Sequence, residues 1–457
     1  MLFGGIVLKK FSNQFSIIIV IAIVFVMILG NSSKPDHPDY ADASEFLTSA
    51  YNISSYGTFS EESKGAVNPG IGREPLYSLY LAILMQVDST FAQFDPECLT
   101  KEKDCNRLYR SAQWSNSIFI ILSGLIMFFS VRLVSRNSFF SSAVSSFHIW
   151  LNYHAYKNHQ YIISDPFALF LMSIFVFSLI YAVQKKRFLF WILPSLSLAL
   201  LTLVKAVFLY LALIFLLSFF LFTIFQKKKI FFLKVFFLVL VVYGLTVGPW
   251  MYRNYNISGY PAITEIRGGI ALSKRSALNG MNFYQYFAAF AYWTRGVGDS
   301  IAEKFFSEDH WKSFDLYEAK GFYNLGLQTY YKRVNQLVGE GKSRVESSRV
   351  IEKQLLVEMI QNLPKHFLVT FPVFYRGLWV DQFILISFPA LIWAMFFAWK
   401  NRRYDILACL VPGIFCLVFY SLFTPNLPRY QLLSLPAFSL SLGLFLRMLR
   451  DRISLSK

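Results

Sequence analysis

Charged side chains stand at the borders of long apolar runs in this sequence, where chemistry beside a membrane would need them. The acidic candidates are Asp39, Asp42, Glu45 and Asp165. The basic candidates are Arg73, Lys205, Arg253 and Arg429. An ionisable group at or near a bilayer costs free energy, so we treat each of these residues as a functional candidate.

A carboxylate and several cations at headgroup depth could together transfer a group from a lipid phosphate. Lys and Arg stabilise a phosphate, and do so most when negative charge grows on a departing group. A carboxylate on the opposite side can take the proton of an attacking hydroxyl or amine. These residue types therefore indicate transfer from a lipid-linked anion to an acceptor.

Each candidate also has a purely structural explanation. Asp42 is placed to cap a helix, with Glu45 three residues later and Gly57 at the far end. Capping and catalysis are compatible roles, because the start of a helix also holds a carboxylate rigidly.

The other candidates have structural explanations of the same kind. Asp165 precedes Pro166, which is a natural helix start. Lys205 could extend out of a tight hairpin toward the polar layer, and Arg253 and Arg429 could anchor their segments at the interface. Spacing alone leaves both sets of roles open.

The composition shows what kind of scaffold must position these residues. The chain has 457 residues, of which 55% are hydrophobic and 16% charged, whereas a soluble domain has about a quarter charged residues. These values exclude a soluble enzyme, a disordered chain and a disulfide scaffold. We predict an all-α polytopic membrane protein with about ten spans. The spans are expected at 13–31, 113–134, 138–153, 166–184, 188–204, 206–225, 230–250, 381–399, 405–423 and 431–448.

The basic residues predict the orientation of these spans. The net charge is +17, but Lys and Arg form short clusters between the apolar runs, which argues against nucleic-acid binding. If the spans alternate, every cluster falls on one side, which the positive-inside bias makes cytoplasmic. Both termini are then cytoplasmic. The clusters are Lys9–Lys10, Arg132 with Arg136, Lys185–Arg187, Lys227–Lys229, Lys400–Arg403 and Arg447–Arg452.

Five segments follow from this topology. They are a tail and first span (1–31), a first outer loop with interfacial helices (32–112), a helix bundle (113–250), a large outer segment (251–380) and the last spans (381–457). Cys98 and Cys105 lie in the first outer loop, either as a disulfide or as inert thiols. Cys409 and Cys416 lie within a span and are expected to be apolar filler.

Several motifs resemble those of a known superfamily. Asp42-x-x-Glu45-Phe46, Gly57-Thr-Phe-Ser60 and Arg73-Glu-Pro75-Leu-Tyr77 are similar to the first outer loop of GT-C glycosyltransferases. The branch is the one that contains protein O-mannosyltransferases and the ArnT aminoarabinose transferase (glycosyltransferase family 39 and its bacterial relatives). Further matches are Ser164-Asp165-Pro166, Leu201-Thr-Leu-Val-Lys205, Pro249-Trp250-Met-Tyr-Arg253-Asn254 and Pro428-Arg429-Tyr430.

The chain also departs from the family pattern. Leu76 stands where the family has Gly, and Asp165 where Glu is common. The segment 251–380 matches nothing in the family, and acceptor choice would reside there.

The resemblance implies an inverting transfer of a sugar from a polyprenyl phosphate to an acceptor on the outer face. Asp42 would be the general base, with Asp39 as its rival, and Asp165 the second carboxylate of the site. The donor phosphate would face Lys205, Arg253 and Arg429. The predicted substrate-binding residues are Asp39, Glu45, Arg73 and Tyr77.

The partners and the location follow from the same reading. We expect a polyprenyl-phosphate-linked sugar donor, membrane lipids and an outer acceptor, which could be a lipid, glycan, protein or cell-wall polymer. No cofactor is predicted, although a divalent cation between Asp42 and Asp165 stays open because some GT-C relatives need one. A bacterial or archaeal plasma membrane is the expected location, with the endoplasmic reticulum as the alternative.

A transporter or flippase for a lipid-linked sugar is the second hypothesis. It predicts ionisable residues in mid-span and interrupted repeats. The candidate charges stand at span ends instead, which favours the transferase over the transporter and over a structural or sensor protein.

Overall fold

The structure, a computed structural model, describes residues 18–19, 21–25, 41–62, 68–100, 105–158, 161–225, 229–265 and 267–455. Every regular element within these ranges is helical, so the all-α prediction is confirmed. The predicted first span, 13–31, lies mostly outside the described residues. Each of the other predicted spans coincides with a helix.

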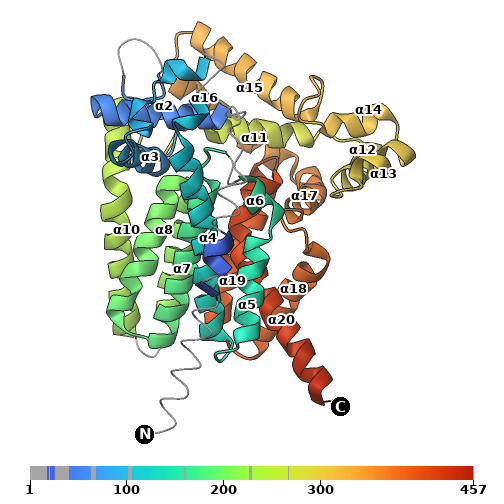
Figure 1. Cartoon of the computed structure of the whole chain (residues 1–457). Coiled ribbons are helices and arrows are strands. Elements are labelled where there is room, and N and C mark those ends of the chain that lie inside the picture. The colour runs from blue at the N-terminus through green and yellow to red at the C-terminus, as the bar shows by residue number, and fades with distance from the viewer. Residues whose placement is uncertain are drawn as a thin grey trace.

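Apolar helices stand side by side and form a bundle (Figure 1). Five stretches are long and apolar enough to cross a membrane. They are α4 (Arg110–Val134), α7 (Asp165–Lys185), α10 (Lys229–Ser258), α19 (Tyr404–Phe423) and Pro428–Arg452, which combines η6 (Pro428–Ser434) with α20 (Leu435–Leu455). Shorter members are α5 (Phe139–Trp150), η4 (Phe188–Trp191), α8 (Ile192–Val204), α9 (Phe208–Ile224) and α18 (Ile384–Lys400). The chain is an integral membrane protein.

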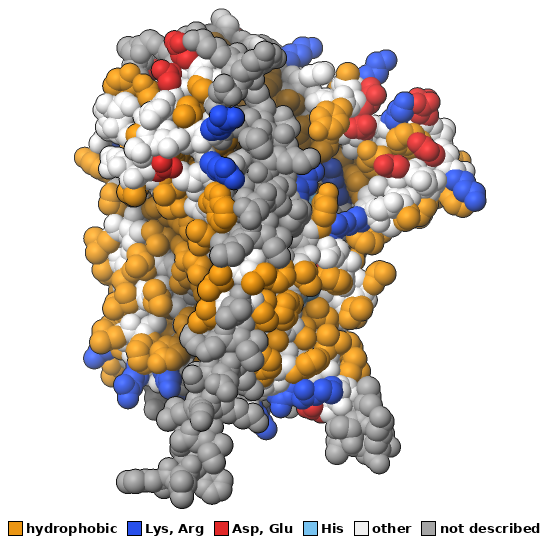
Figure 2. Space-filling model, viewed as in Figure 1, with side chains coloured by type: hydrophobic (Ala, Val, Ile, Leu, Met, Phe, Trp, Pro, Cys, Tyr) orange, Lys and Arg blue, Asp and Glu red, His pale blue; other side chains and the backbone are white. Residues whose placement is uncertain are grey.

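Basic residues gather at one end of the bundle, which we call the basic end. Arg403 donates to the carbonyl of Val134 at 2.8 Å, and Arg447 donates to the carbonyl of Ser135. These bonds bring the ends of several spans together, as the alternating topology predicts. Figure 2 shows Lys and Arg along the lower edge of a broad hydrophobic band.

The opposite end, which we call the α2 end, carries helices outside the bundle (Figure 1). From the first outer loop come α2 (Ala41–Tyr56), α3 (Pro75–Val87), η1 (Phe91–Gln93), η2 (Pro96–Thr100) and η3 (Cys105–Arg107), with α6 (Tyr153–Asn158) joining them from within the bundle segment. From the large segment come α11 (Arg267–Leu278), α12 (Phe283–Tyr292), α13 (Gly298–Phe305), α14 (Glu308–Trp311), η5 (Lys312–Phe314), α15 (Phe322–Gly339), α16 (Arg344–Gln361) and α17 (Leu363–Leu378). Cys98 and Cys105 form a disulfide, with their Cα atoms 5.7 Å apart, a normal separation.

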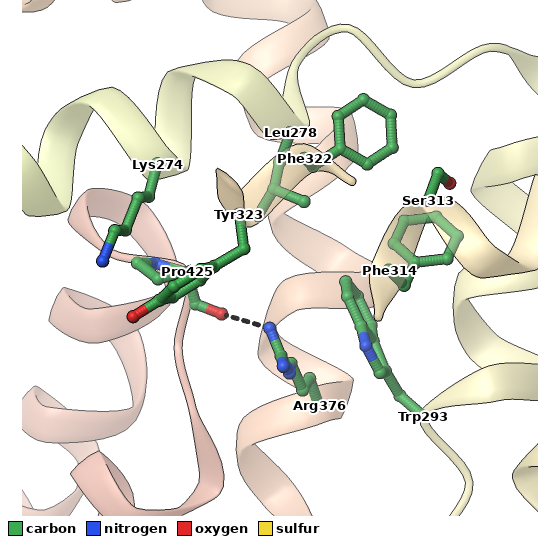
Figure 3. Close-up of a pocket in the computed structure, with 9 residues that line it drawn as sticks. All are labelled: Lys274, Leu278, Trp293, Ser313, Phe314, Phe322, Tyr323, Arg376 and Pro425. Atoms are coloured by element: carbon green, nitrogen blue, oxygen red, sulfur yellow. Dashed lines mark hydrogen bonds between the residues drawn. The ribbon is translucent and has the colours of Figure 1, made fainter. Parts of the chain in front are cut away.

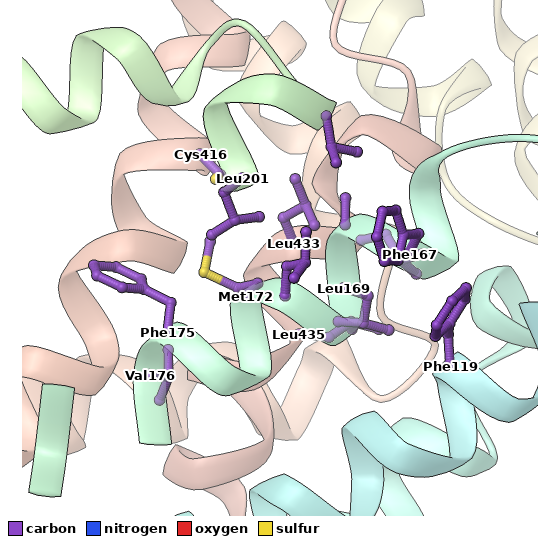
Figure 4. Close-up of a cluster of buried hydrophobic side chains, with 14 of the residues drawn as sticks. Phe119, Phe167, Leu169, Met172, Phe175, Val176, Leu201, Cys416, Leu433 and Leu435 are labelled. Carbon is purple, nitrogen blue, oxygen red and sulfur yellow. The ribbon is translucent and has the colours of Figure 1, made fainter. Parts of the chain in front are cut away.

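Buried apolar side chains hold the bundle together directly below the start of α7. Figure 4 shows Phe119, Phe167, Leu201 and Leu433 converging from α4, α7, α8 and η6. The rings of Phe119 and Phe167 lie 4.9 Å apart. Between membrane helices, such close packing rather than removal of apolar surface from water supplies much of the stability. It fixes the start of α7, and with it Asp165.

Candidate active site

Asp42 lies in the first described turn of α2. The prediction that it caps the helix is wrong, because the helix already includes Ala41 and arginine side chains bind the carboxylate. The predicted helix end is confirmed, since Gly57 follows Tyr56 with a φ of +66° and donates its N–H to the carbonyl of Ile53 at 3.0 Å. A carboxylate in the first turn also interacts favourably with the helix dipole.

Two arginines bind the two oxygens of the Asp42 carboxylate. Arg73 donates through Nη2 to Oδ1, and Arg429 donates through Nη2 to Oδ2 at 2.8 Å. Arg73 also binds Glu45 through Nε, and Glu45 accepts a further bond from Arg267. The result is a row of alternating charges across the α2 end.

This arrangement determines the charge of Asp42. Burial would raise the pKa of this carboxyl, but Arg73 and Arg429 outweigh burial and hold the pKa well below its usual value of 3.8. Asp42 is therefore a stable carboxylate at neutral pH while both arginines stay in place.

Asp165 and Lys205 form a second ion pair, with Nζ 3.1 Å from Oδ1. The side chain of Asp165 is only 6% exposed, and Lys205 ends α8. The backbone N–H of Ala206 donates to Glu74 at 3.1 Å, which ties the turn after α8 to the start of α3. Asp165 also lies within electrostatic range of Arg429, so the two ion pairs adjoin.

The guanidinium of Arg253 is occupied by backbone carbonyls. It donates to Gly70 at 2.8 Å and to Phe59 at 3.1 Å, and it stacks on Trp250 with a separation of 4.4 Å. Arg253 thus holds the segment that presents Arg73. Its predicted contact with the donor phosphate stays a prediction, and the geometry favours a positioning role.

Trp250 and Asn254, which belong to the same motif as Arg253, donate to the carbonyl of Ile263 at 2.8 Å and 3.1 Å. The motif around Pro249 therefore fixes, by hydrogen bonds to its backbone, the segment that leads into α11.

Tyr77, a predicted substrate-binding residue, does not line the charged row. Tyr77 is fully buried, donates to Asn116 at 3.3 Å and meets the ring of Phe46 edge-on at 5.1 Å. Its side chain packs in the core, so it can support α2 but lies away from the surface that a substrate would reach. Asp39 lies outside the described residues.

Sequence reasoning missed several residues of this region. Arg267 and Glu74 belong to it, and only Glu74 had a signal in the sequence, because it stands within the Arg73-Glu-Pro75 motif. Asn426 holds the loop before Arg429. It adopts a φ of +50°, donates to the carbonyl of Val373 at 2.8 Å and accepts from Gln431 at 2.6 Å. Such an amide cannot be identified from spacing.

A buried polar network elsewhere in the bundle was also missed. His148 contacts Asp381 through Nε2 at 2.9 Å and Ser439 through Nδ1 at 2.7 Å. Ser387 also donates to Asp381. These contacts connect α5 to the starts of α18 and α20. Because each polar side chain of the network has a hydrogen-bond partner, the network is tolerated inside the apolar bundle.

The carboxylates of the site already face protein cations, Asp42 two arginines and Asp165 a lysine. Within the described ranges, no cluster of three or more His, Cys, Asp or Glu side chains is close enough to hold a metal ion. The ion-pair arrangement instead favours binding of an anion that can share these cations.

No protein-family model matches the chain, and no curated protein sequence matches it. Solved structures do. The archaeal oligosaccharyltransferase AglB from Archaeoglobus fulgidus, in complex with an inhibitory peptide and a dolichol-phosphate, superimposes with a TM-score of 0.53 at 11% identity, covering 98% of this chain and 52% of AglB. The apo form of the same enzyme gives a TM-score of 0.52 at 12% identity, covering 96% of this chain and 52% of that one.

ArnT from Cupriavidus metallidurans, bound to undecaprenyl phosphate, is similar at a TM-score of 0.46 and 10% identity, over 95% of this chain and 60% of ArnT. The chain spans about half the length of the AglB structures it matches. At this level of identity the likeness to AglB establishes the fold alone. The predicted GT-C-type fold is confirmed, because this chain superimposes on AglB over nearly its whole length.

Proposed function

We propose that the protein is a membrane glycosyltransferase that moves a sugar from a polyprenyl-phosphate donor to an acceptor at the α2 end, which faces the periplasm or lumen. The observation that carries the proposal is the Asp42 carboxylate bound between Arg73 and Arg429. This group lies at the polar end of an apolar bundle, next to the Asp165–Lys205 pair. Support also comes from AglB, which shares the fold and has been solved with a dolichol-phosphate and a peptide.

Lys205 and Arg429 are the cations that we assign to the donor phosphate. Both are about one-fifth exposed, so a ligand can reach them. Each faces a carboxylate now, and a phosphate can replace that partner with equally strong charge-assisted hydrogen bonds. Their charge then stabilises the phosphate as it departs.

Asp42 becomes the general base when the donor binds. In the resting protein its low pKa makes it a weak base, because Arg73 and Arg429 neutralise it. A phosphate that draws Arg429 away leaves the partly buried carboxylate with one arginine fewer, so its pKa rises toward a useful value. Donor binding thereby switches the base on only when there is a sugar to transfer.

The proposed step is an inverting substitution at the anomeric carbon of the donor sugar. A hydroxyl or amine of the acceptor attacks the anomeric carbon from the face opposite the phosphate, which inverts that carbon. Its proton goes to the Asp42 carboxylate. The bond from the anomeric carbon to the phosphate oxygen breaks, and its electron pair leaves with the polyprenyl phosphate.

Glu45 and Asp165 supply the remaining polar contacts in this scheme. Glu45 keeps Arg73 and Arg267 in place, and both side chains of the Glu45–Arg267 pair are more than one-third exposed. Asp165 is nearly buried and fixes Lys205. We assign Asp165 to orienting the donor cation and the sugar rather than to proton transfer.

The test is a transfer assay with purified protein in lipid nanodiscs, to which polyprenyl-phosphate sugars and an acceptor fraction, both extracted from the host membrane, are added. The protein should release free polyprenyl phosphate from this mixture, and Asp42→Asn should reduce the release at least a hundredfold. Asp309→Asn, an exposed acid in the first turn of α14, is the matched control and should retain full activity. If lipids change sides in vesicles without losing their sugar, the protein is a flippase and the proposal is wrong.

A further inference from the structure

The helix α12 of the large outer segment carries a row of exposed aromatic side chains. Phe283, Tyr284 and Phe287 are 71%, 62% and 47% exposed, and their spacing of three and four residues places them on one face. Ala288 and Ala289 are buried against the rest of the molecule. No residue of α12 carries a charge. The helix therefore packs inward through small side chains and presents large apolar ones outward.

The helix α17 has an exposed apolar face of its own, and this face continues onto the bundle. Phe367 and Phe371 are both more than half exposed, and Phe374 follows on the same side. The ring of Phe374 lies 6.2 Å from that of Phe388 in the apolar helix α18, where Leu385 is largely exposed. Since α18 belongs to the bundle of an integral membrane protein, lipid is the medium that its exposed side chains meet.

Polar and aromatic contacts fix α12 to the end of α17 nearest the bundle. The ring of Phe290 lies 5.3 Å from that of Tyr375, whose hydroxyl is 2.7 Å from that of Thr294. Tyr375 in turn meets Trp379, which directly follows α17, at 5.8 Å. In Figure 1 α12, α13 and α14 project sideways from the α2 end as an arm, while α18 descends along the bundle. The arm thus begins at the level where α18 leaves the bundle.

The exposed rings of α12 are not the remains of an incomplete core. Behind them the segment has a core of its own, in which Trp293, Phe314 and Phe322 lie together (Figure 3). The rings of Trp293 and Phe314 are 5.0 Å apart, and Val369 and Val373 of α17 complete the cluster. The outward side chains are therefore additional apolar surface, and a contiguous surface of this kind is typical of an interaction site.

The charges of the arm lie on other helices than α12. Exposed acids stand on α13 and α14, at Asp299, Glu303, Glu308 and Asp309. Figure 2 shows acidic side chains on the projecting arm and the broad hydrophobic band of the bundle below it. Acids are repelled by anionic headgroups, so the chemistry of the arm favours apolar contact with a bilayer rather than attraction to lipid charge.

We propose that α12 and α17 lie along the surface of the bilayer at the α2 end, with Phe283, Phe287 and Phe371 inserted among the lipids. Helices of this kind bury their apolar face about 5–10 Å into the boundary between headgroups and acyl chains, and aromatic rings favour that depth. The acids of α13 and α14 stay in water. The large segment is then held from two sides, by the bundle through α17 and by the lipid through α12, whatever reaction the protein catalyses.

The test uses nitroxide spin labels on single cysteines of the full-length protein in nanodiscs. Molecular oxygen concentrates in lipid and a neutral nickel chelate in water, so their relaxation of the label reports its surroundings. Labels at Phe287→Cys and Phe371→Cys should show an oxygen-to-nickel ratio close to that of Leu385→Cys in α18. This ratio should be severalfold higher than at Asp309→Cys on α14, the control for water. The native cysteines are bonded or buried and do not react.

The same ratios are expected in nanodiscs of neutral and of anionic lipids, because the contact is apolar. Phe283→Cys, on the same face of α12, repeats the measurement if Phe287→Cys fails to fold. A label on α12 as open to nickel as that at Asp309 would overturn the inference, because α12 would then project above the membrane. Protection from both reagents would also overturn it and would indicate a protein cover, with dipolar broadening between labels identifying a second copy of this chain.

Discussion

Arg429 donates a 2.8 Å hydrogen bond to Asp42, although 387 positions separate the two residues in the chain. The bond joins the start of α2 to η6, the first turn region of the last span. Arg429 and Arg73 both bind this carboxylate. Arg429 can therefore bind a second anion while Arg73 still neutralises Asp42. In the proposed mechanism, this relationship lets donor binding raise the pKa of Asp42 and so make it a stronger base.

The pH dependence of the reaction should reveal this response. In the free protein the pKa of Asp42 lies below its usual value, so the carboxylate is charged at every pH above about 4. Donor binding removes one arginine and raises that pKa. The acid limb of kcat, which reports the bound protein, should therefore lie about one pH unit or more above the acid limb of kcat/KM for the donor.

Steady-state rates between pH 4 and pH 8 measure this difference, because kcat/KM should show no acid limb from Asp42 in this range whereas kcat should fall toward pH 4. A kcat that stays as flat as kcat/KM over this range would show that the donor leaves the carboxylate and its arginines as they are.

Lys205 should affect the donor and not the acceptor. Lys205→Ala removes a charge-assisted bond to the phosphate and should raise the donor KM about tenfold to a hundredfold. The acceptor KM should stay within about twofold of wild type. Competition by farnesyl phosphate gives the same information without a sugar, because the variant should bind it more weakly. Unchanged donor kinetics would make Lys205 only an anchor for Asp165.

The variant Arg253→Met distinguishes a role in positioning Arg73 from a role in binding the donor phosphate. Arg253→Met loses two bonds to backbone carbonyls and should lower the free energy of unfolding by about 1–3 kcal/mol. If Arg253 positions the segment with Arg73, activity and thermal stability should fall together, while the donor KM of the remaining folded protein changes little. A large rise in the donor KM at unchanged stability would restore the phosphate contact that the family motif predicts.

The topology predicts opposite labelling at the two ends of the bundle. A cysteine at Lys353 of α16, at the α2 end, should react with an impermeant maleimide added to intact cells. A cysteine at Arg402, at the basic end, should react only after the cells are opened. The native cysteines do not interfere, because Cys98 and Cys105 are bonded and Cys409 and Cys416 are buried. Reaction at Arg402 in intact cells would invert the proposed orientation.

The sequence predicted the helices of the bundle because lipid leaves a long apolar run little choice other than a helix. It also predicted that Asp42, Arg73 and Arg429 belong to one region, through the order of the motifs. The capping role of Asp42 was wrong, since a side chain 387 positions away decides what the carboxylate binds. Local spacing carries no information about such a partner.

A small pocket lined by Lys274, Tyr323 and Arg376 (Figure 3) could not be predicted for a related reason. It arises where α11, α15 and α17 meet, and the contact depends on the absence of a side chain at Gly326. The pair of His148 and Asp381, 233 positions apart, is another product of tertiary packing. Neither set of residues shows a pattern along the chain, because helix packing angles rather than periodicity determine it.

Mass spectrometry of membrane lipids and surface glycans tests the central claim most directly. Cells that carry the wild-type protein, no protein, or Asp42→Asn are compared, with Asp309→Asn as the control. We predict a glycosylated product in the wild-type and control cells alone, and accumulation of the polyprenyl-phosphate sugar in the other two. Identical lipid and glycan masses in all four strains would contradict the account.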